Sequence, residues 1–168
     1  MNIVLIGMRG TGKTTIGAIL SKRLSRTLIE TDALIENITG MRISDLVDQR
    51  GWNHFRDIES KIIFEVSASD ECVIATGGGV VTRPENIYAL RQHGILIWLR
   101  ADIQTMEKRV GNDANRPSLT AKRTLREEII EVKNKREVLY RNASDIRIKT
   151  DHRSPRMLVH QILQTITL

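Results

Sequence analysis

The chain has 168 residues, with 26 Lys and Arg against 20 Asp and Glu, and a formal charge of +6. Its 40% hydrophobic and 27% charged residues are typical of a globular protein and exclude a disordered chain. No apolar run reaches the ~18–20 residues of a membrane span, and the N-terminus lacks the basic start of a signal peptide. We therefore expect a cytoplasmic protein with no membrane partner. The length fits one domain, residues 1–168, and the single Cys72 excludes an internal disulfide.

The positive charge raises the possibility of a nucleic-acid partner, which the rest of the composition does not favour. Residues 101–168 hold 14 basic and 9 acidic side chains, but the two signs alternate without a long basic run. Aromatic residues make up only 4% of the chain, so the stacking surface of a single-strand binder is almost absent. We expect small anionic ligands and no nucleic acid.

Short apolar runs alternate with segments of helical spacing along the chain. The apolar runs predict strands at Asn2–Ile6, Thr27–Ile29, Cys72–Ala75, Ile95–Leu99 and Ile146–Lys149. Helical spacing predicts helices at Lys13–Leu24, Ile43–Arg50, Phe55–Ser69, Pro84–Gln92, Ile103–Val110, Leu125–Tyr140 and Pro155–Ile166. The polar segment Gly111–Lys122 is expected to be a loop. This alternation predicts an α/β fold in which helices cover both faces of a parallel sheet.

The segment Gly7–Thr14 matches the phosphate-binding pattern G-x-x-x-x-G-K-[ST], with an apolar strand before it and a helix after it. Glycines allow backbone N–H groups to converge on phosphate oxygens, and the helix N-terminus adds its positive dipole end. Lys13 can reach the β- and γ-phosphates, and the Thr14 hydroxyl can bind Mg²⁺. The residues expected to bind ATP here are Gly10, Thr11, Gly12, Lys13, Thr14 and Thr15.

A GTPase switch protein is one alternative for a chain with this loop. Asp48–Gly51 imitates a D-x-x-G motif, and Asn134–Glu137 is close to N-K-x-D. Both lie in or at the end of predicted helices, and the second lacks the aspartate that would bind guanine. We interpret both as solvated helix surface and favour a kinase for a small molecule.

Three further clusters predict an acceptor pocket. Asp32 follows the second strand, Arg56 opens a helix, and Gly77, Gly78 and Gly79 follow the third strand. Ligands of open α/β sheets bind beyond the carboxyl ends of the strands, so these groups should border one crevice with the phosphate-binding loop. Asp32 can hydrogen-bond or deprotonate a hydroxyl, and Arg56 can bind a carboxylate through two N–H groups.

Taken together, these segments resemble the shikimate kinase family over nearly the whole chain. The resemblance rests on the phosphate-binding loop, Asp32, Phe55–Glu59, Gly77–Val81, Arg116–Leu119 and Arg136–Ala143. It implies a five-stranded parallel sheet of the nucleoside-monophosphate-kinase type, with a mobile lid at about 111–122. It also implies transfer of the ATP γ-phosphoryl group to the 3-hydroxyl of shikimate, with Mg²⁺ as cofactor and a monomeric enzyme.

The resemblance also implies roles for individual residues. Lys13, Asp32 and Arg116 would be catalytic, with Asp32 holding the reacting hydroxyl and Arg116 bridging the transferring phosphate. Shikimate would be bound by Asp32, Arg56, Gly77, Gly78, Gly79 and Arg136, with the two arginines on its carboxylate. The nucleotide would also contact Arg109, Arg116, Arg153 and Pro155. Magnesium would be held by Thr14, by Glu30 through water and by Asp32.

Three positions depart from the usual family pattern. Glu30 replaces an aspartate, Trp52 replaces an acidic residue before the Phe-Arg pair, and Ser118 replaces a leucine in the lid. We expect these changes to affect affinity and metal geometry more than the reaction. A kinase for another polyol acid, such as gluconate, remains an alternative, as does a nucleic-acid-binding module that uses ATP as a switch.

Overall fold

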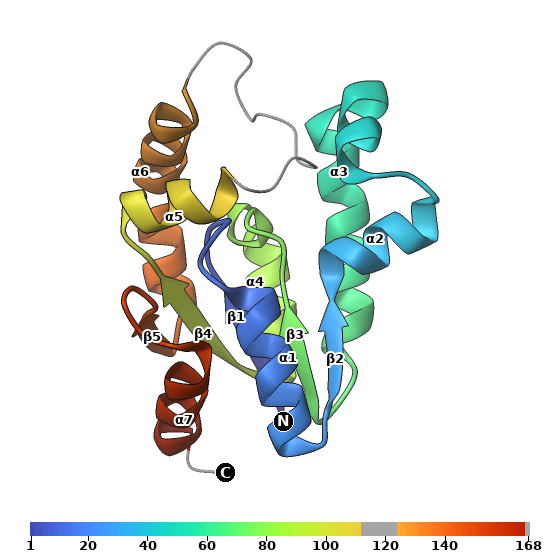
Figure 1. Cartoon of the computed structure of the whole chain (residues 1–168). Helices are drawn as coiled ribbons and strands as arrows, with labels where there is room; N and C mark the ends of the chain where they lie inside the picture. The colour runs from blue at the N-terminus through green and yellow to red at the C-terminus, as the bar shows by residue number, and fades with distance from the viewer. Residues whose placement is uncertain (112–123, 167–168) are drawn as a thin grey trace.

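The computed structural model describes residues 1–111 and 124–166, which form a five-stranded parallel sheet with helices on both faces (Figure 1). The strand order is β2-β3-β1-β4-β5, and every neighbouring pair is parallel. The strands are β1 (Asn2–Ile6), β2 (Thr27–Glu30), β3 (Cys72–Ala75), β4 (Gly94–Arg100) and β5 (Ile146–Lys149). The predicted fold class is confirmed, and each predicted strand lies within two residues of its observed bounds.

The helices divide between the two faces of the sheet. Helices α1 (Lys13–Leu24) and α7 (Pro155–Thr165) cover one face, while α3 (Ile43–Ser67), α4 (Pro84–His93) and α6 (Leu125–Ala143) cover the other. The remaining helical segments are α2 (Thr31–Thr39), α5 (Ile103–Val110) and a 3₁₀ turn, η1 (Val80–Thr82). Among the described residues, none of these helices combines the length and the apolar character needed to cross a membrane.

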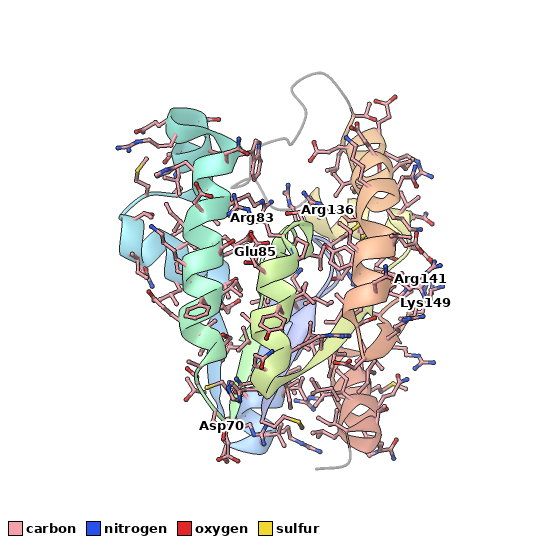
Figure 2. All side chains as sticks on the ribbon, turned by 180° about the vertical axis from the view of Figure 1, so that it is seen from behind. Asp70, Arg83, Glu85, Arg136, Arg141 and Lys149 are labelled. Atoms are coloured by element: carbon pink, nitrogen blue, oxygen red, sulfur yellow. The ribbon has the colours of Figure 1, made fainter. Side chains whose placement is uncertain are left out.

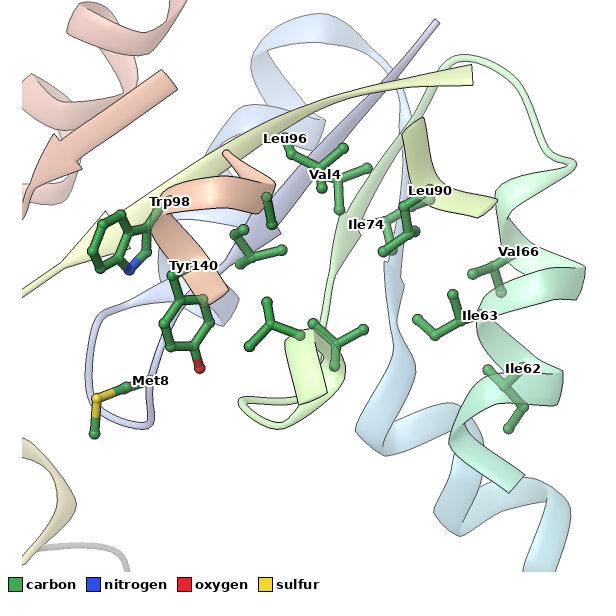
Figure 3. Packing of buried hydrophobic residues seen from close by; sticks show 14 of the residues in the cluster. Val4, Met8, Ile62, Ile63, Val66, Ile74, Leu90, Leu96, Trp98 and Tyr140 are labelled. Carbon is green, nitrogen blue, oxygen red and sulfur yellow. The ribbon is translucent and has the colours of Figure 1, made fainter. Parts of the chain in front are cut away.

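Strand β1 shows why the sheet is covered on both sides. Successive strand side chains point to opposite faces, and all five residues of β1 are buried. Ile3 and Leu5 pack with α1 and α7, whereas Val4 and Ile6 belong to the larger cluster under α3, α4 and α6, shown in Figure 3. The continuous apolar sequence of β1 is therefore satisfied by helices on both faces.

Two helical features differ from the sequence prediction. Helix α2, which carries Asp32 in its first turn, was not predicted, although Leu34, Ile35 and Ile38 have helical spacing. Helix α3 continues through the gap predicted after Arg50, with one break at Gly51, where φ is 81° and ψ is 164°. The break separates two helical pieces without an intervening loop, so residues 52–54 are helical.

Candidate active site

The phosphate-binding loop joins β1 to α1 at the carboxyl edge of the sheet. Gly12 caps α1 with φ of 94°, a left-handed conformation that glycine adopts without steric cost. Helix α1 then begins at Lys13, whose Nζ donates hydrogen bonds to the carbonyl oxygens of Gly7 at 2.8 Å and Met8 at 2.9 Å. The lysine thus lies across the loop, at the positive end of α1, where the free backbone N–H groups suit a phosphate.

A cavity of about 640 Å³ opens above this loop. Arg109 is fixed at its wall, because its guanidinium donates to the carbonyl oxygens of Gly10 at 3.0 Å and Thr150 at 3.2 Å. The lining includes all the described residues that the sequence assigns to ATP and the metal ion: Gly10, Thr11, Gly12, Lys13, Thr14, Thr15, Glu30, Asp32, Arg109, Arg153 and Pro155. We call this space the nucleotide cavity.

A second, smaller cavity of about 80 Å³ lies between α3, α6 and the loop after β3, and we call it the acceptor cavity. Arg56 lies in its wall, and its Nη1 is 2.5 Å from Oε2 of Glu59, which is fully buried. The Arg56 guanidinium also lies 5.4 Å from the ring centre of Trp52 and 4.9 Å from that of Phe55, within the range of a cation–π contact. Arg56 is therefore held by one carboxylate and two aromatic rings.

Glu59 is the structural partner of Arg56. Burial raises the pKa of Glu59, and the positive charge and hydrogen bond of Arg56 act in the opposite direction. Among the described residues, Oε1 of Glu59 accepts no hydrogen bond, and the side chain lines the acceptor cavity. The pair therefore places a guanidinium at the cavity wall, with a buried carboxylate behind it.

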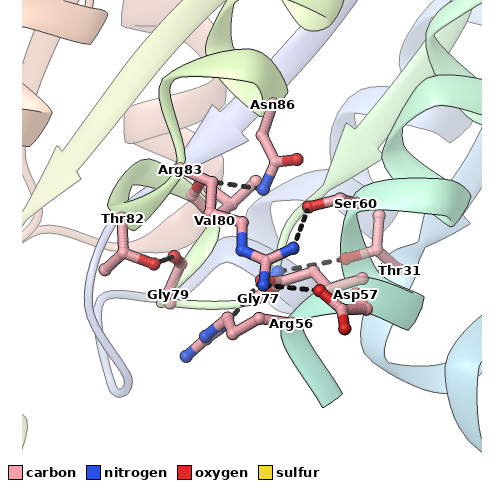
Figure 4. A network of polar contacts seen from close by, with 12 residues as sticks. Thr31, Arg56, Asp57, Ser60, Gly77, Gly79, Val80, Thr82, Arg83 and Asn86 are labelled. Carbon is pink, nitrogen blue, oxygen red and sulfur yellow. Dashed lines mark hydrogen bonds and ion pairs between the residues drawn. The ribbon is translucent and has the colours of Figure 1, made fainter. Parts of the chain in front are cut away.

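The glycine loop after β3 passes very close to Arg56. A Cβ atom on Gly79 would lie only 1.9 Å from Nη2 of Arg56, so a side chain there would displace the guanidinium. Polar contacts hold this loop in place (Figure 4): Thr31 Oγ1 accepts from the Gly77 N–H at 3.1 Å, and Thr82 Oγ1 donates to the Gly79 carbonyl oxygen at 2.7 Å. Glycine at position 79 is required by this close approach.

Helix α6 binds the same loop from the other side. Arg136 donates from Nη1 to the carbonyl oxygen of Gly78 at 3.1 Å, and the Tyr140 hydroxyl donates to the same oxygen. Arg136 lies on the side of α6 towards α3, with Lys149 beyond α6, as seen from behind in Figure 2. Burial raises the pKa of Tyr140 to about 12, so its hydroxyl remains a donor at neutral pH.

Asp32 lies where the two cavities meet. Four residues line both of them: Arg9, Asp32, Ile43 and Val110. The carboxylate of Asp32 packs against the glycine loop, since a Cβ atom on Gly77 would lie 2.5 Å from its Oδ1. A group bound in one cavity can therefore approach a group bound in the other at this carboxylate.

The structure brings together all the predicted site residues that it describes, and it adds three that sequence reasoning did not assign. Arg116 and most of the predicted lid lie outside the described residues. The added residues are Trp52, Glu128 and Tyr140; the first two line the acceptor cavity, and Glu128 is buried there. Helical spacing is the sequence signal that could have identified Glu128 as a site residue. It shares one face of α6 with Leu125, Ile129, Val132 and Arg136.

Comparison with known proteins agrees with this geometry. A family model described as shikimate kinase matches residues 9–167. The chain belongs to the shikimate kinase family. It is 42% identical to a shikimate kinase of Pseudomonas syringae and 39% identical to one of Rippkaea orientalis; these matches cover 96% and 99% of this chain and 94% and 88% of those proteins. A shikimate kinase of Acinetobacter baumannii, solved in complex with shikimate, superposes with a TM-score of 0.94 at 33% identity, covering 98% of this chain and 92% of that one.

The departures from the usual shikimate kinase pattern can be located in this fold. Glu30 lines the nucleotide cavity, and Ser118 lies outside the described residues. Trp52 lines the acceptor cavity and contacts Arg56 through its ring, four residues along the same helix. Arg56, the arginine of the shikimate kinase motif, therefore contacts an aromatic side chain at position 52 in place of an acidic one.

Proposed function

We propose that the chain transfers the γ-phosphoryl group of ATP to the 3-hydroxyl of shikimate, giving shikimate 3-phosphate and ADP. The observation that supports it best is the meeting of the nucleotide and acceptor cavities at Asp32. Phosphoryl transfer depends mainly on positioning and charge stabilisation, and this arrangement supplies both. In the reaction, the hydroxyl oxygen bonds to the γ-phosphorus as the bond between that phosphorus and ADP breaks.

The charged groups of the acceptor cavity match the polarity of shikimate. Arg56 and Arg136 bind the substrate carboxylate at the glycine-loop end, where both guanidinium groups are already anchored. Asp32 orients the reacting hydroxyl and accepts its proton at a carboxylate oxygen. Gly77, Gly78 and Gly79 leave room for the ring beside the backbone.

On the nucleotide side, Lys13 binds the β- and γ-phosphates through Nζ, after releasing the Gly7 and Met8 carbonyl oxygens, and the backbone of Gly10–Thr15 surrounds them. Arg109, Arg153 and Pro155 border the adenine. Arg116 remains a predicted phosphate-bridging residue. The chain functions as a single kinase domain, a cytoplasmic monomer without nucleic-acid or membrane partners.

Magnesium fits the donors of this site. Thr14, Glu30 and Asp32 line one cavity, and among the described residues no three His, Cys, Asp or Glu side chains converge as a metal cage. Mg²⁺ commonly keeps several waters and takes one or two carboxylates plus substrate phosphates. Thr14 and Asp32 would help to hold it, Glu30 would do so through water, and the ion would neutralise charge on the phosphates.

A coupled ADP-release assay tests the function. We expect ADP release that depends on shikimate and on Mg²⁺, with little release when gluconate replaces shikimate. Folded protein that releases ADP faster with gluconate, or that ignores shikimate, would contradict the proposal. Tight polynucleotide binding with a steep salt dependence would favour the nucleic-acid alternative.

Asp32→Asn tests the proton acceptor. A positioned general base contributes about 10²–10⁴-fold, so kcat should fall within that range while the shikimate KM changes less. Asp48→Asn is the matched control, because Asp48 is exposed on α3 and lines neither cavity. An Asp32→Asn enzyme with the kcat of Asp48→Asn would show that Asp32 is not the base.

A further inference from the structure

A third cavity, of about 180 Å³, lies behind the phosphate-binding loop. Its walls come from Met8 and Thr11 of the loop, the end of β4, helices α5 and α6, and Lys149 of β5. Thr11 of the phosphate-binding loop lines this space, but no other described residue that we assign to substrate binding does. It is therefore distinct from the nucleotide and acceptor cavities, although it touches the wall of each.

Among the described residues around this cavity, one cation has no ion-pair partner. Arg100 lies 3.8 Å from Glu137, and Lys149 lies 3.2 Å from Asp102, so these two cations face the two carboxylates of the lining. Lys133 is half-buried on α6 and makes no hydrogen bond or ion pair within the described part of the chain. The Lys133 side chain therefore offers a positive charge at the wall of the cavity, and a small anion bound there would be its counter-ion.

Two aromatic residues belong to the lining of this cavity. Trp98 and Tyr140 stack with ring centres 5.6 Å apart, and Figure 3 places both near Met8 at one end of the core cluster. The Arg100 guanidinium lies 4.8 Å from the centre of the Trp98 ring. A ligand here would therefore have Trp98, Tyr140 and Lys133 among its neighbours.

We propose that this cavity binds a small organic monoanion, a carboxylate attached to one flat apolar ring. The single unpaired cation selects one negative charge, and the aromatic lining selects a ring over an inorganic anion. The volume agrees, since about 180 Å³ corresponds to roughly six waters at ~30 Å³ each and lies below the ~300–1,000 Å³ of drug-sized sites.

Occupation of this cavity should be coupled to the substrate sites. Thr11 lines both this cavity and the nucleotide cavity, and Met8 lines both this cavity and the acceptor cavity. Tyr140 adds a link, because its hydroxyl holds the Gly78 carbonyl oxygen of the acceptor cavity. A ligand that fixes these residues changes the affinity for nucleotide, and nucleotide changes its affinity by the same factor.

Calorimetry with benzoate tests the site on the full chain. Titrations run with shikimate at saturation, so that benzoate cannot occupy the acceptor cavity. We expect benzoate to bind and the neutral benzamide to bind about tenfold more weakly or not at all, because a charge-assisted hydrogen bond is lost. Absence of benzoate binding, or equal binding of benzamide, would overturn the proposal.

Two variants locate the binding. Lys133→Met should weaken benzoate by about tenfold or more. Lys135→Met is the matched control, because Lys135 pairs with Glu131 at 2.6 Å, is 71% exposed and does not line the cavity. Equal benzoate affinity in the two variants, at matched melting temperatures, would refute the site.

Repeating the benzoate titration with saturating ADP tests the coupling. Its Kd should change by about fivefold or more, and an unchanged Kd would refute the link to the phosphate-binding loop. Shikimate-dependent ADP release by the wild-type chain is measured separately. Failure of the benzoate site therefore leaves the proposed reaction standing, and failure of the reaction is recognised by its own assay.

Discussion

At the scale of single residues, the acceptor cavity depends on how closely Arg56 approaches the backbone of Gly79. The guanidinium occupies the space in which any side chain at position 79 would lie. The obstructing atoms belong to the flexible end of Arg56, so an added methyl group displaces that end rather than the fold. Gly79 thus controls where the positive charge lies.

Gly79→Ala should therefore raise the shikimate KM by about tenfold or more, because a misplaced guanidinium loses its paired hydrogen bonds to the carboxylate. It should also lower the melting temperature, because the buried Glu59 loses its ion-pair partner. Steady-state kinetics and thermal unfolding on the same sample measure both effects. Gly40→Ala is the control, since Gly40 lines neither cavity and a Cβ there would meet no atom within 4 Å. A Gly79→Ala enzyme with an unchanged KM would show that Arg56 does not bind the carboxylate.

Tyr140 predicts a specific dependence of stability on alkaline pH. Desolvation raises its pKa from 10.0 to about 12, so between these values the unfolded chain loses the phenolic proton while the folded chain keeps it. The stability from this group is complete below pH 10 and is lost as pH rises through about 12, by roughly 3 kcal/mol.

Tyr140→Phe should lower the free energy of unfolding by about 1 kcal/mol near neutral pH, because the hydrogen bond to the Gly78 carbonyl oxygen is lost. Above pH 10, the stability of this variant should fall less steeply than that of the wild type. Denaturant unfolding across this pH range measures both parts. Tyr88→Phe is the control, because Tyr88 is 71% exposed. Parallel pH curves for wild type and Tyr140→Phe would contradict the interpretation.

Local sequence identified the charged groups of the site better than the groups that hold them. Asp32 stands out because it follows a strand at the edge where ligands bind, Arg56 because it opens a helix in the Phe-Arg motif, and Arg136 because of the family resemblance. Trp52 does not, because its contact with Arg56 follows only once the helix is known to include residues 52–54. The role of Tyr140 depends on a carbonyl oxygen 62 residues away, which no local pattern encodes.

At the scale of the element, helix α3 is defined by its break at Gly51. The φ of 81° with ψ of 164° belongs to a region that only glycine adopts readily, and a Cβ there would meet no atom within 4 Å. The strain of a substitution would therefore come from the backbone alone. The break sets the direction of the helical piece that carries Trp52 and Arg56.

Gly51→Ala should destabilise the chain by about 1–3 kcal/mol, a fall in Tm of roughly 2–4 °C per kcal/mol at this size. Gly40→Ala is the matched control: it also has positive φ, 65°, and open space, but its ψ of 15° lies in the left-handed helical region that alanine tolerates better. Equal melting temperatures for the two variants would show that the break is not strained.

The missed helix α2 shows a limit of pattern reasoning at this scale. Its nine residues follow β2 directly, and Thr31 and Ile35 are its buried positions. Two buried positions in a short segment give too weak a period to separate a helix from a loop. The strands and the longer helices were predictable because continuous apolar runs and strong helical spacing extend over more residues.

At the scale of the whole molecule, part of the excess positive charge lies beside the nucleotide site. Arg23, Arg153, Arg156 and His160 line one exposed hollow formed by α1 and α7, and Arg153 also lines the nucleotide cavity. Such a surface attracts an anionic nucleotide before it makes specific contacts. The composition alone indicates anionic ligands, and this surface lies next to the cavity that we assign to the nucleotide.

Raising the ionic strength from ~0.01 to ~0.15 M should increase the ATP KM several-fold, because the Debye length falls from ~30 to ~8 Å. The double variant Arg23→Gln/Arg156→Gln should show a smaller salt effect with unchanged kcat, since neither residue lines the nucleotide cavity. Initial-rate kinetics over a salt series measure it. If the ATP KM of the variant depended on salt as strongly as that of the wild type, the dependence would come from the arginines of the nucleotide cavity, Arg109 and Arg153.

The shared wall of Arg9, Asp32, Ile43 and Val110 has a consequence for inhibitor design. Because the two substrate cavities meet without a separating layer, one compound can place a nucleotide mimic and a cyclic carboxylate in both at once. Joining two weak ligands makes the second binding event intramolecular, and the gain can reach about 10²–10⁴-fold when the linker matches the span. The linker should be short and should carry a hydroxyl-like donor towards Asp32.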